Sequence, residues 1–195
     1  MRDGDNIRGV ESLGIDWMGF IFYPPSKRFV DAMPEYLPEK TKRVGVFVNE
    51  SIAIILEKVA AFHLDIVQLH GDELPELCQQ LTNNDVKVMK AFGIDTTFPF
   101  EKIDQYEGYC DYFLFDTQTS EYGGSGRKFN WDILQNYQGN TPFLLSGGIG
   151  ADDVQTIREF SHPQCIGIDI NSQFEVSPAN KDIQSIQQFI KSLKQ

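Results

Sequence analysis

Residues 113–131 read Phe-Leu-Phe-Asp-Thr-Gln-Thr-Ser-Glu-Tyr-Gly-Gly-Ser-Gly-Arg-Lys-Phe-Asn-Trp. A short apolar run ends in one carboxylate, Asp116, and a glycine-rich loop then leads into a helical pattern. Continuous apolar strands are typical of parallel sheets that are covered on both faces. In such proteins the chemistry lies at the carboxyl ends of the strands, so Asp116 is the first candidate for catalysis.

The bulk composition indicates one globular domain spanning residues 1–195. Hydrophobic residues make up 41% of the chain and charged residues 23%, which argues against disorder. The net charge of −11 disfavours nucleic acids and anionic membranes as partners. No apolar run approaches the roughly 18 residues that a membrane span needs. The polar start, Met-Arg-Asp-Gly-Asp-Asn, does not resemble a signal peptide.

The cysteines and histidines are scattered along the sequence. Cys78, Cys110 and Cys165 form no Cys-x-x-Cys pair, and an odd number of cysteines suggests reduced thiols and a cytoplasmic location. No histidine, cysteine and carboxylate cluster has the spacing of metal ligands. We therefore expect no metal site.

Short apolar runs alternate with helical patterns, which predicts a parallel sheet, either open and doubly wound or closed into a barrel. The expected strands are 18–23, 44–48, 66–69, 86–92, 112–116, 143–146 and 166–170. The expected helices are 5–13, 51–62, 74–81, 130–136, 152–160 and 182–193, with a weaker helical pattern at 98–106.

The first helical pattern, at residues 5–13, has no strand before it. A closed eight-stranded barrel begins with a strand and usually takes about 200 residues or more. We therefore predict a (β/α)8 TIM barrel that is truncated at its N-terminus, so that seven strands are visible. Met1 would then be an internal methionine of a longer reading frame or the edge of a shortened polypeptide.

Two loops at strand ends are candidate phosphate sites. Residues 146–150 read Ser-Gly-Gly-Ile-Gly just before a helical pattern, and glycines with helix-start amides favour a phosphate. In barrels the phosphate commonly lies between the loops after strands seven and eight. The next strand ends at Asp169, where Asn171 and Ser172 can supply donors to the same phosphate. The alternatives are a tight turn without a ligand and simple turn capping by Asp169 and Ser172.

Three further strand-end residues are candidates. Arg28 follows a stiff Pro-Pro loop and can hold a carboxylate in fork geometry, or it can be a solvated loop arginine. His70 can contact a substrate, although a lone histidine is more often structural. A buried Asp116 can have a raised pKa and act as a general acid, or it can cap a turn. The loop 123–126 would then be a lid or a phosphate-side loop.

Taken together, these segments resemble the phosphoribosylanthranilate isomerase family of tryptophan biosynthesis. The matching runs appear in family order and cover nearly the whole chain: 19–28 (Gly-Phe-Ile-Phe-Tyr-Pro-Pro-Ser-Lys-Arg), 44–49 (Val-Gly-Val-Phe-Val-Asn), 67–73 (Val-Gln-Leu-His-Gly-Asp-Glu), Asp116 with 123–131, 145–149 (Leu-Ser-Gly-Gly-Ile) and 169–175 (Asp-Ile-Asn-Ser-Gln-Phe-Glu) before Lys181-Asp182.

The resemblance implies a (β/α)8 barrel and an Amadori rearrangement without a cofactor or metal. N-(5′-phosphoribosyl)anthranilate would become 1-(2-carboxyphenylamino)-1-deoxyribulose 5-phosphate. The residues that match family positions have these implied roles: Asp116 as the general acid, Arg28 at the anthranilate carboxylate, and Gly147, Gly148, Asn171 and Ser172 in the phosphate loops. We also expect His70, Gly124 and Asp169 to contact the substrate.

Two departures from the family pattern affect these expectations. The family usually has Ser-Ser-Gly where this chain has Asn171-Ser172-Gln173, which changes how closely the backbone can approach a phosphate. The family's general base is a cysteine in a Cys-Gly segment that ends the first strand, and none of the three cysteines here can stand in. We therefore expect substrate binding without efficient turnover, and unpaired strand edges that weaken stability and favour association.

Other functions stay open at this point. A second hypothesis of an enzyme is another phosphate-binding barrel, such as a related sugar-phosphate isomerase or an indole-glycerol-phosphate-type synthase. A hypothesis from another functional class is a non-catalytic barrel that binds a phosphorylated ligand. In each case the expected partner is a small phosphorylated molecule, and the expected assembly is a monomer or a homodimer.

Overall fold

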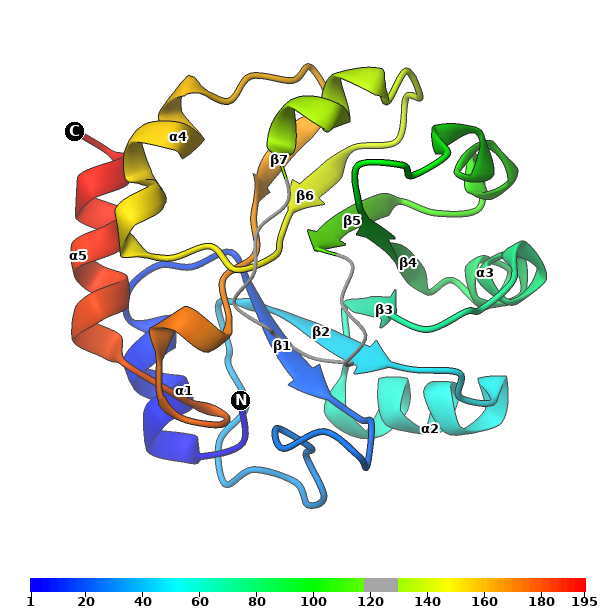
Figure 1. Ribbon diagram of the computed structural model, residues 1–195. Helices are drawn as coiled ribbons and strands as arrows, with labels where there is room; N and C mark the ends of the chain where they lie inside the picture. Colours follow the sequence, from blue (N-terminus) through cyan, green and yellow to red (C-terminus); the bar gives the residue numbers. More distant parts are fainter. Residues whose placement is uncertain (118–129) are drawn as a thin grey trace.

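The computed structural model describes residues 1–117 and 130–195, in which seven strands form one parallel sheet in chain order (Figure 1). The strands are β1 (Trp17–Ile21), β2 (Lys42–Phe47), β3 (Ile66–Leu69), β4 (Lys87–Ile94), β5 (Tyr112–Thr117), β6 (Phe143–Leu145) and β7 (Cys165–Ile168). The predicted alternation of strands and helices is confirmed, and each predicted strand lies within about two residues of the observed one.

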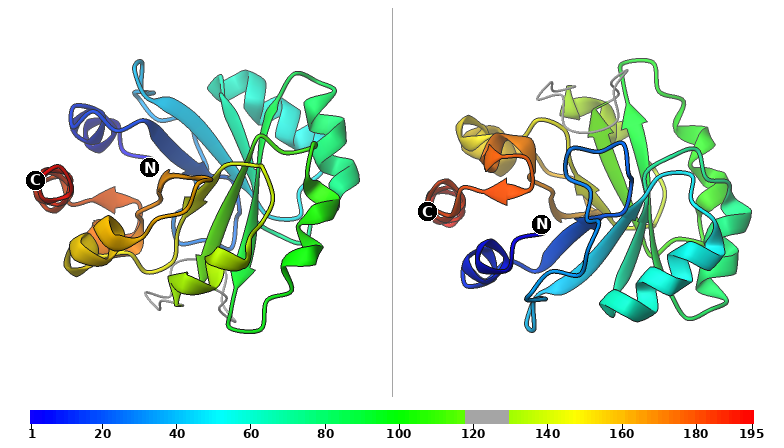
Figure 2. Two further views of the ribbon diagram at one scale, coloured as in Figure 1. Left: turned by 90° about the horizontal axis from the view of Figure 1, so that it is seen from above. Right: turned by 90° about the horizontal axis from the view of Figure 1, so that it is seen from below.

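The α-helices of the described residues surround the curled sheet on its outer side (Figure 2). They are α1 (Gly4–Glu11), α2 (Ile52–Phe62), α3 (Pro75–Thr82), α4 (Val154–Glu159) and α5 (Ile183–Leu193). Side chains just ahead of α1, α2 and α5 accept from free backbone N–H groups of the first turn, as expected for N-caps. Asp3 accepts from Asn6 N at 2.7 Å, and Asp182 accepts from Ser185 N at 3.1 Å.

The two faces of the sheet bury different sets of side chains, because successive residues of a strand point to opposite faces. The outer face packs against the helices through fully buried phenylalanines at positions 20, 47, 113, 115 and 143. The inner face carries a smaller cluster of Val44, Ile66, Met89, Ala91 and Leu114. This inner cluster forms an apolar floor below the carboxyl ends of the strands.

Several predicted helices are shorter and tighter than expected. The segment 130–136 is the 3₁₀ helix Trp131–Asn136, and 98–106 splits into the 3₁₀ helices Phe100–Lys102 and Asp104–Tyr106. The predicted helix 152–160 begins as the 3₁₀ turn Ala151–Asp153 and continues as α4. The tighter 3₁₀ form is common in short segments and at the ends of α-helices.

The segment after β7 contains structure that we did not predict. A 3₁₀ turn at Ser172–Phe174 leads into an antiparallel hairpin of β8 (Glu175–Ser177) and β9 (Asn180–Lys181). Strands of two and three residues are too short to show an alternating pattern. The hairpin lies beside α1, because Asn6 and Lys181 exchange hydrogen bonds at 2.9 and 2.8 Å.

The sheet curls without closing across the residues that the structure describes. Among the strands described there, β1 pairs with β2, apart from a single bridge between Ile21 and Phe29, and β7 pairs with β6. At the edge of β1, the Met1 N donates to the carbonyl of Gly19 at 2.9 Å. Figure 2 shows the start of the chain between β1 and the C-terminal elements. None of the described helices is long and apolar enough to cross a membrane.

Candidate active site

A cavity of about 740 Å³ opens at the carboxyl ends of the strands and extends into the gap between β1 and β7. Its lining includes every candidate residue that the structure describes: Arg28, His70, Asp116, Gly147, Gly148, Asp169, Asn171 and Ser172. Gly124 lies outside the described residues. A cavity of this volume is within the range of small-molecule sites.

Asp116 and His70 face each other across the mouth of this cavity. Asp116 Oδ2 lies 3.5 Å from His70 Nε2, and about a quarter of each side chain is exposed. The other carboxylate oxygen, Oδ1, accepts from Thr117 N at 2.8 Å. The acid candidate is therefore held in a fixed orientation but stays accessible from the cavity.

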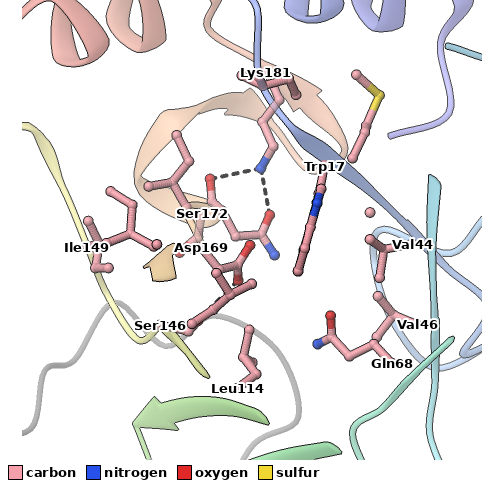
Figure 3. Close-up of a pocket in the computed structure, with 18 of the residues that line it drawn as sticks. Trp17, Val44, Val46, Gln68, Leu114, Ser146, Ile149, Asp169, Ser172 and Lys181 are labelled. Atoms are coloured by element: carbon pink, nitrogen blue, oxygen red, sulfur yellow. Dashed lines mark hydrogen bonds between the residues drawn. The ribbon is translucent and has the colours of Figure 1, made fainter. Parts of the chain in front are cut away.

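Asp169 places a second carboxyl group in the same cavity, just beyond β7 (Figure 3). Its Oδ2 accepts from Ser146 Oγ at 3.1 Å. Burial and the charge of Asp116 raise the pKa of Asp169 above its ordinary value of 3.8. Between the ordinary pKa and the raised pKa of Asp169, the native state binds more protons than the unfolded state. The contribution of this group to the free energy of unfolding therefore falls as the pH rises through that range.

Gly147 is required by packing against β5 as well as by the turn. Its φ is +99°, and that of Gly148 is +67°, in the region that favours glycine. A Cβ at Gly147 would lie 2.6 Å from Thr117 N and 3.0 Å from Asp116 Oδ1. The loop after β6 therefore reaches the acid candidate only because residue 147 has no side chain.

Arg28 does hold a carboxylate in fork geometry, but that carboxylate belongs to Glu175 of the same chain. Arg28 Nε lies 3.0 Å from Glu175 Oε1 and Nη2 lies 2.7 Å from Oε2, and both side chains are largely buried. The alternative of a solvated loop arginine is therefore wrong. Burial opposes ionisation of Glu175, but the Arg28 bonds and Lys181 hold its pKa below the usual range.

Lys181 extends this charge network to the loop after β7. Its Nζ donates to the backbone oxygen of Asn171 at 2.9 Å, to Asn171 Oδ1 at 2.6 Å and to Glu175 Oε1 at 3.1 Å (Figure 3). Burial lowers the pKa of Lys181, although Glu175 opposes this shift. Sequence reasoning gave Glu175 and Lys181 no role. The only available signal was two opposite charges in a short segment after a strand.

The three cysteines lie away from the described lining of the cavity. Cys78 and Cys110 are buried, and Cys165 begins β7 at the opposite end from the mouth, where burial raises its pKa. Across residues 1–117 and 130–195, no group of three or more His, Cys, Asp or Glu side chains is arranged to hold a metal ion.

Figure 3 shows the two sides of the cavity. Ser146, Asp169 and Lys181 lie on one side, Val44, Val46 and Gln68 lie on the other, and the Trp17 ring stands between them. Polar groups thus converge at the strand ends over an apolar floor. A curled parallel sheet with outer helices and such a cavity defines an α/β protein of the TIM-barrel class with a small-molecule site.

Comparisons with known proteins identify the family. The family model of N-(5′-phosphoribosyl)anthranilate (PRA) isomerase matches residues 2–192. A protein of that name from Phocaeicola vulgatus is 52% identical over 195 residues, which cover all of this chain and 95% of the relative. The chain therefore belongs to the N-(5′-phosphoribosyl)anthranilate isomerase family.

Solved structures agree with this assignment. Phosphoribosyl anthranilate isomerase from Thermotoga maritima superimposes with a TM-score of 0.83 and 32% identity, covering 100% of this chain and 98% of that one. A second structure of a phosphoribosyl anthranilate isomerase contains reduced 1-(o-carboxyphenylamino)-1-deoxyribulose 5-phosphate. It superimposes with a TM-score of 0.79 and 30% identity, covering 100% and 98% of the two chains.

Proposed function

We propose that the cavity at the strand ends binds N-(5′-phosphoribosyl)anthranilate and is built to isomerise it by the Amadori rearrangement of this family. The observation that carries the proposal is the convergence of Asp116, His70 and Asp169 with two strand-end loops in one cavity. The family match over residues 2–192 supports it.

Asp116 is the proposed general acid. Its proton would pass to the ribose ring oxygen as the bond from C1′ to that oxygen breaks, which opens the ring to an iminium. A base then removes the proton on C2′, and the resulting enolamine tautomerises to the ketone. Substrate and product are isomers, so no external oxidant or reductant takes part. A positioned proton-transfer group typically contributes about 10²–10⁴-fold to such a step.

The two ends of the substrate would meet different parts of the cavity. The loops that contain Gly147–Gly148 and Asn171–Ser172 would hold the phosphate through backbone and side-chain donors. Gln173, in place of the usual glycine, restricts how closely that backbone can approach. At the other end, Arg28 would receive the anthranilate carboxylate. Because its Nε and Nη2 already contact Glu175, this contact would use Nη1 or require Glu175 to move.

We further propose that an eighth strand, placed between β1 and β7, completes the barrel. Neither strand has a partner strand on that side among the described residues, and the cavity extends between them past Trp17 and Ile166. The general base of the family would enter at the end of that strand, in its Cys-Gly segment. The described lining of the cavity holds no thiol, so the 195-residue chain would bind the substrate and turn it over slowly.

The remaining expectations about partners stay predictions. A net charge of −11 disfavours nucleic acid and anionic membranes, so an anionic ligand would depend on the local cations Arg28 and Lys181. Assembly as a monomer or homodimer and a cytoplasmic location are among these predictions. A non-catalytic barrel would bind its phosphorylated ligand in the same cavity and would differ only in lacking turnover.

Calorimetric titration with reduced 1-(o-carboxyphenylamino)-1-deoxyribulose 5-phosphate tests the binding step. We expect saturable binding with one ligand per chain. The same analogue without its phosphate should bind at least about 10-fold more weakly, because each lost charge-assisted hydrogen bond costs about 1.5–3 kcal/mol. Equal affinities for the two ligands would show that the loops after β6 and β7 are plain turns.

A further inference from the structure

Gln68 and His70 lie two residues apart at the end of β3, so their side chains share the inner face of the sheet. Gln68 is only 9% exposed. Its Nε2 lies 2.9 Å from His70 Nδ1, and His70 Nε2 lies 3.5 Å from Asp116 Oδ2. The imidazole ring thus stands between an amide on β3 and a carboxylate on β5.

The chemistry of the amide determines which ring nitrogen carries the proton. Gln68 Nε2 is only a donor, so the Nδ1 that faces it must accept. A neutral imidazole has one N–H, which must then be on Nε2, the nitrogen that faces Asp116. We propose that Gln68 is a positioning residue that holds His70 as the Nε2–H tautomer, so that the ring donates toward Asp116. This inference rests on the proposed role of Asp116.

The backbone around His70 is fixed independently of Gln68. Lys90 Nζ donates to the carbonyl of Leu69 at 3.3 Å and to that of Gly71 at 2.7 Å, one on each side of His70. Lys90 also pairs with Glu73 at 3.1 Å, and this pair is buried. With both flanking peptides held, the side chains at the two ring nitrogens decide the tautomer, and Gln68 is the one at Nδ1.

The tautomer has a consequence for proton transfer. A second proton on His70 would have to sit on Nδ1, where it would face the donor hydrogens of Gln68. The Nε2–H tautomer therefore places the single N–H of the ring on the side of Asp116, where it can pair with the carboxyl group that is proposed to transfer the proton. The charged groups that face the ring are Asp116 from β5 and Asp169 beyond β7, with the Lys90–Glu73 pair behind the loop.

Nitrogen-15 NMR of histidine-labelled protein tests this inference without a turnover assay. Protonated and bare ring nitrogens resonate far apart, and the chain has three histidines to assign. The spectra are recorded near pH 8, where a histidine with the ordinary pKa of about 6.5 is neutral. We expect His70 in the full 195-residue chain to be predominantly the Nε2–H tautomer. A predominant Nδ1–H tautomer would overturn the proposal, because Gln68 would then present its oxygen.

The variant Gln68→Glu provides the second arm. A carboxylate of the same shape can only accept, so Nδ1 must become protonated and the His70 pattern should invert or become that of the cation. An unchanged pattern in this variant would also overturn the proposal. If the variant does not fold, the parent spectrum still decides.

His162 is the internal control. Its Nδ1 accepts from Gln164 N at 3.1 Å and its Nε2 lies 3.2 Å from the Tyr137 carbonyl, so backbone groups fix it as Nε2–H in both proteins. If His70 is not the Nε2–H tautomer, the role of Gln68 is disproved, but the binding measured by the analogue titration still supports the proposed function. Failure of the titration, with the tautomer as expected, would instead remove the proposed function.

Discussion

Adding a strand that ends in Cys-Gly ahead of Met1 is expected to raise the isomerisation rate by about 10²–10⁴-fold. The strand would pair with the free edges of β1 and β7 and bring a thiol to the mouth, where the described cavity lining has none. Steady-state turnover of N-(5′-phosphoribosyl)anthranilate, followed for both chains under the same conditions, measures the gain.

A matched strand that ends in Ser-Gly separates the effect of the base from that of the fold. Both strands cover the same edges and fill the same space, so both should raise the melting temperature and reduce self-association. Only the cysteine form should raise the rate. If the 195-residue chain already turns over as fast as the cysteine form, the assignment of the base is wrong.

Asp116→Asn in the strand-completed chain is expected to lower kcat by about 10²–10⁴-fold. Asparagine has nearly the same shape but no acidic proton for the ribose ring oxygen. Affinity for the reduced analogue should change little, because the phosphate loops and Arg28 are untouched. Parallel measurement of kcat and of analogue binding distinguishes this result from a loss of binding.

Asp72→Asn is the matched control for that substitution. Asp72 is exposed in the loop after His70, and the same chemical change there should leave kcat and affinity unaltered. A similar loss of kcat in both variants would mean that removal of a negative charge, and not removal of the acid, slows the reaction.

The strands could be predicted from sequence because burial on both faces leaves a continuous apolar run. β3 is the clearest case, since all four of its residues are buried and its predicted and observed limits agree. The segment 130–136 was less predictable. An apolar residue at every third or fourth position fits an α-helix and a 3₁₀ turn equally well, and here the structure adopts the 3₁₀ form.

The positions of the site residues followed from strand ends, but their partners did not. Sequence reasoning placed Asp116 and His70 separately at the mouth, and it did not foresee that they face each other at 3.5 Å. It expected Arg28 to meet a ligand carboxylate, whereas Glu175 reaches it through a hairpin with very short strands. Which acid a guanidinium meets depends on tertiary packing that no local pattern encodes.

In the proposed complex, the loops after β6 and β7 receive the phosphate of a ligand whose sugar lies against Asp116. Backbone amide NMR shifts, mapped with the reduced analogue and with its phosphate-free form, test it most directly. We predict that the two ligands differ most at the amides of Gly147, Gly148, Asn171 and Ser172. Differences confined to other loops, such as the one before α2, would contradict the account.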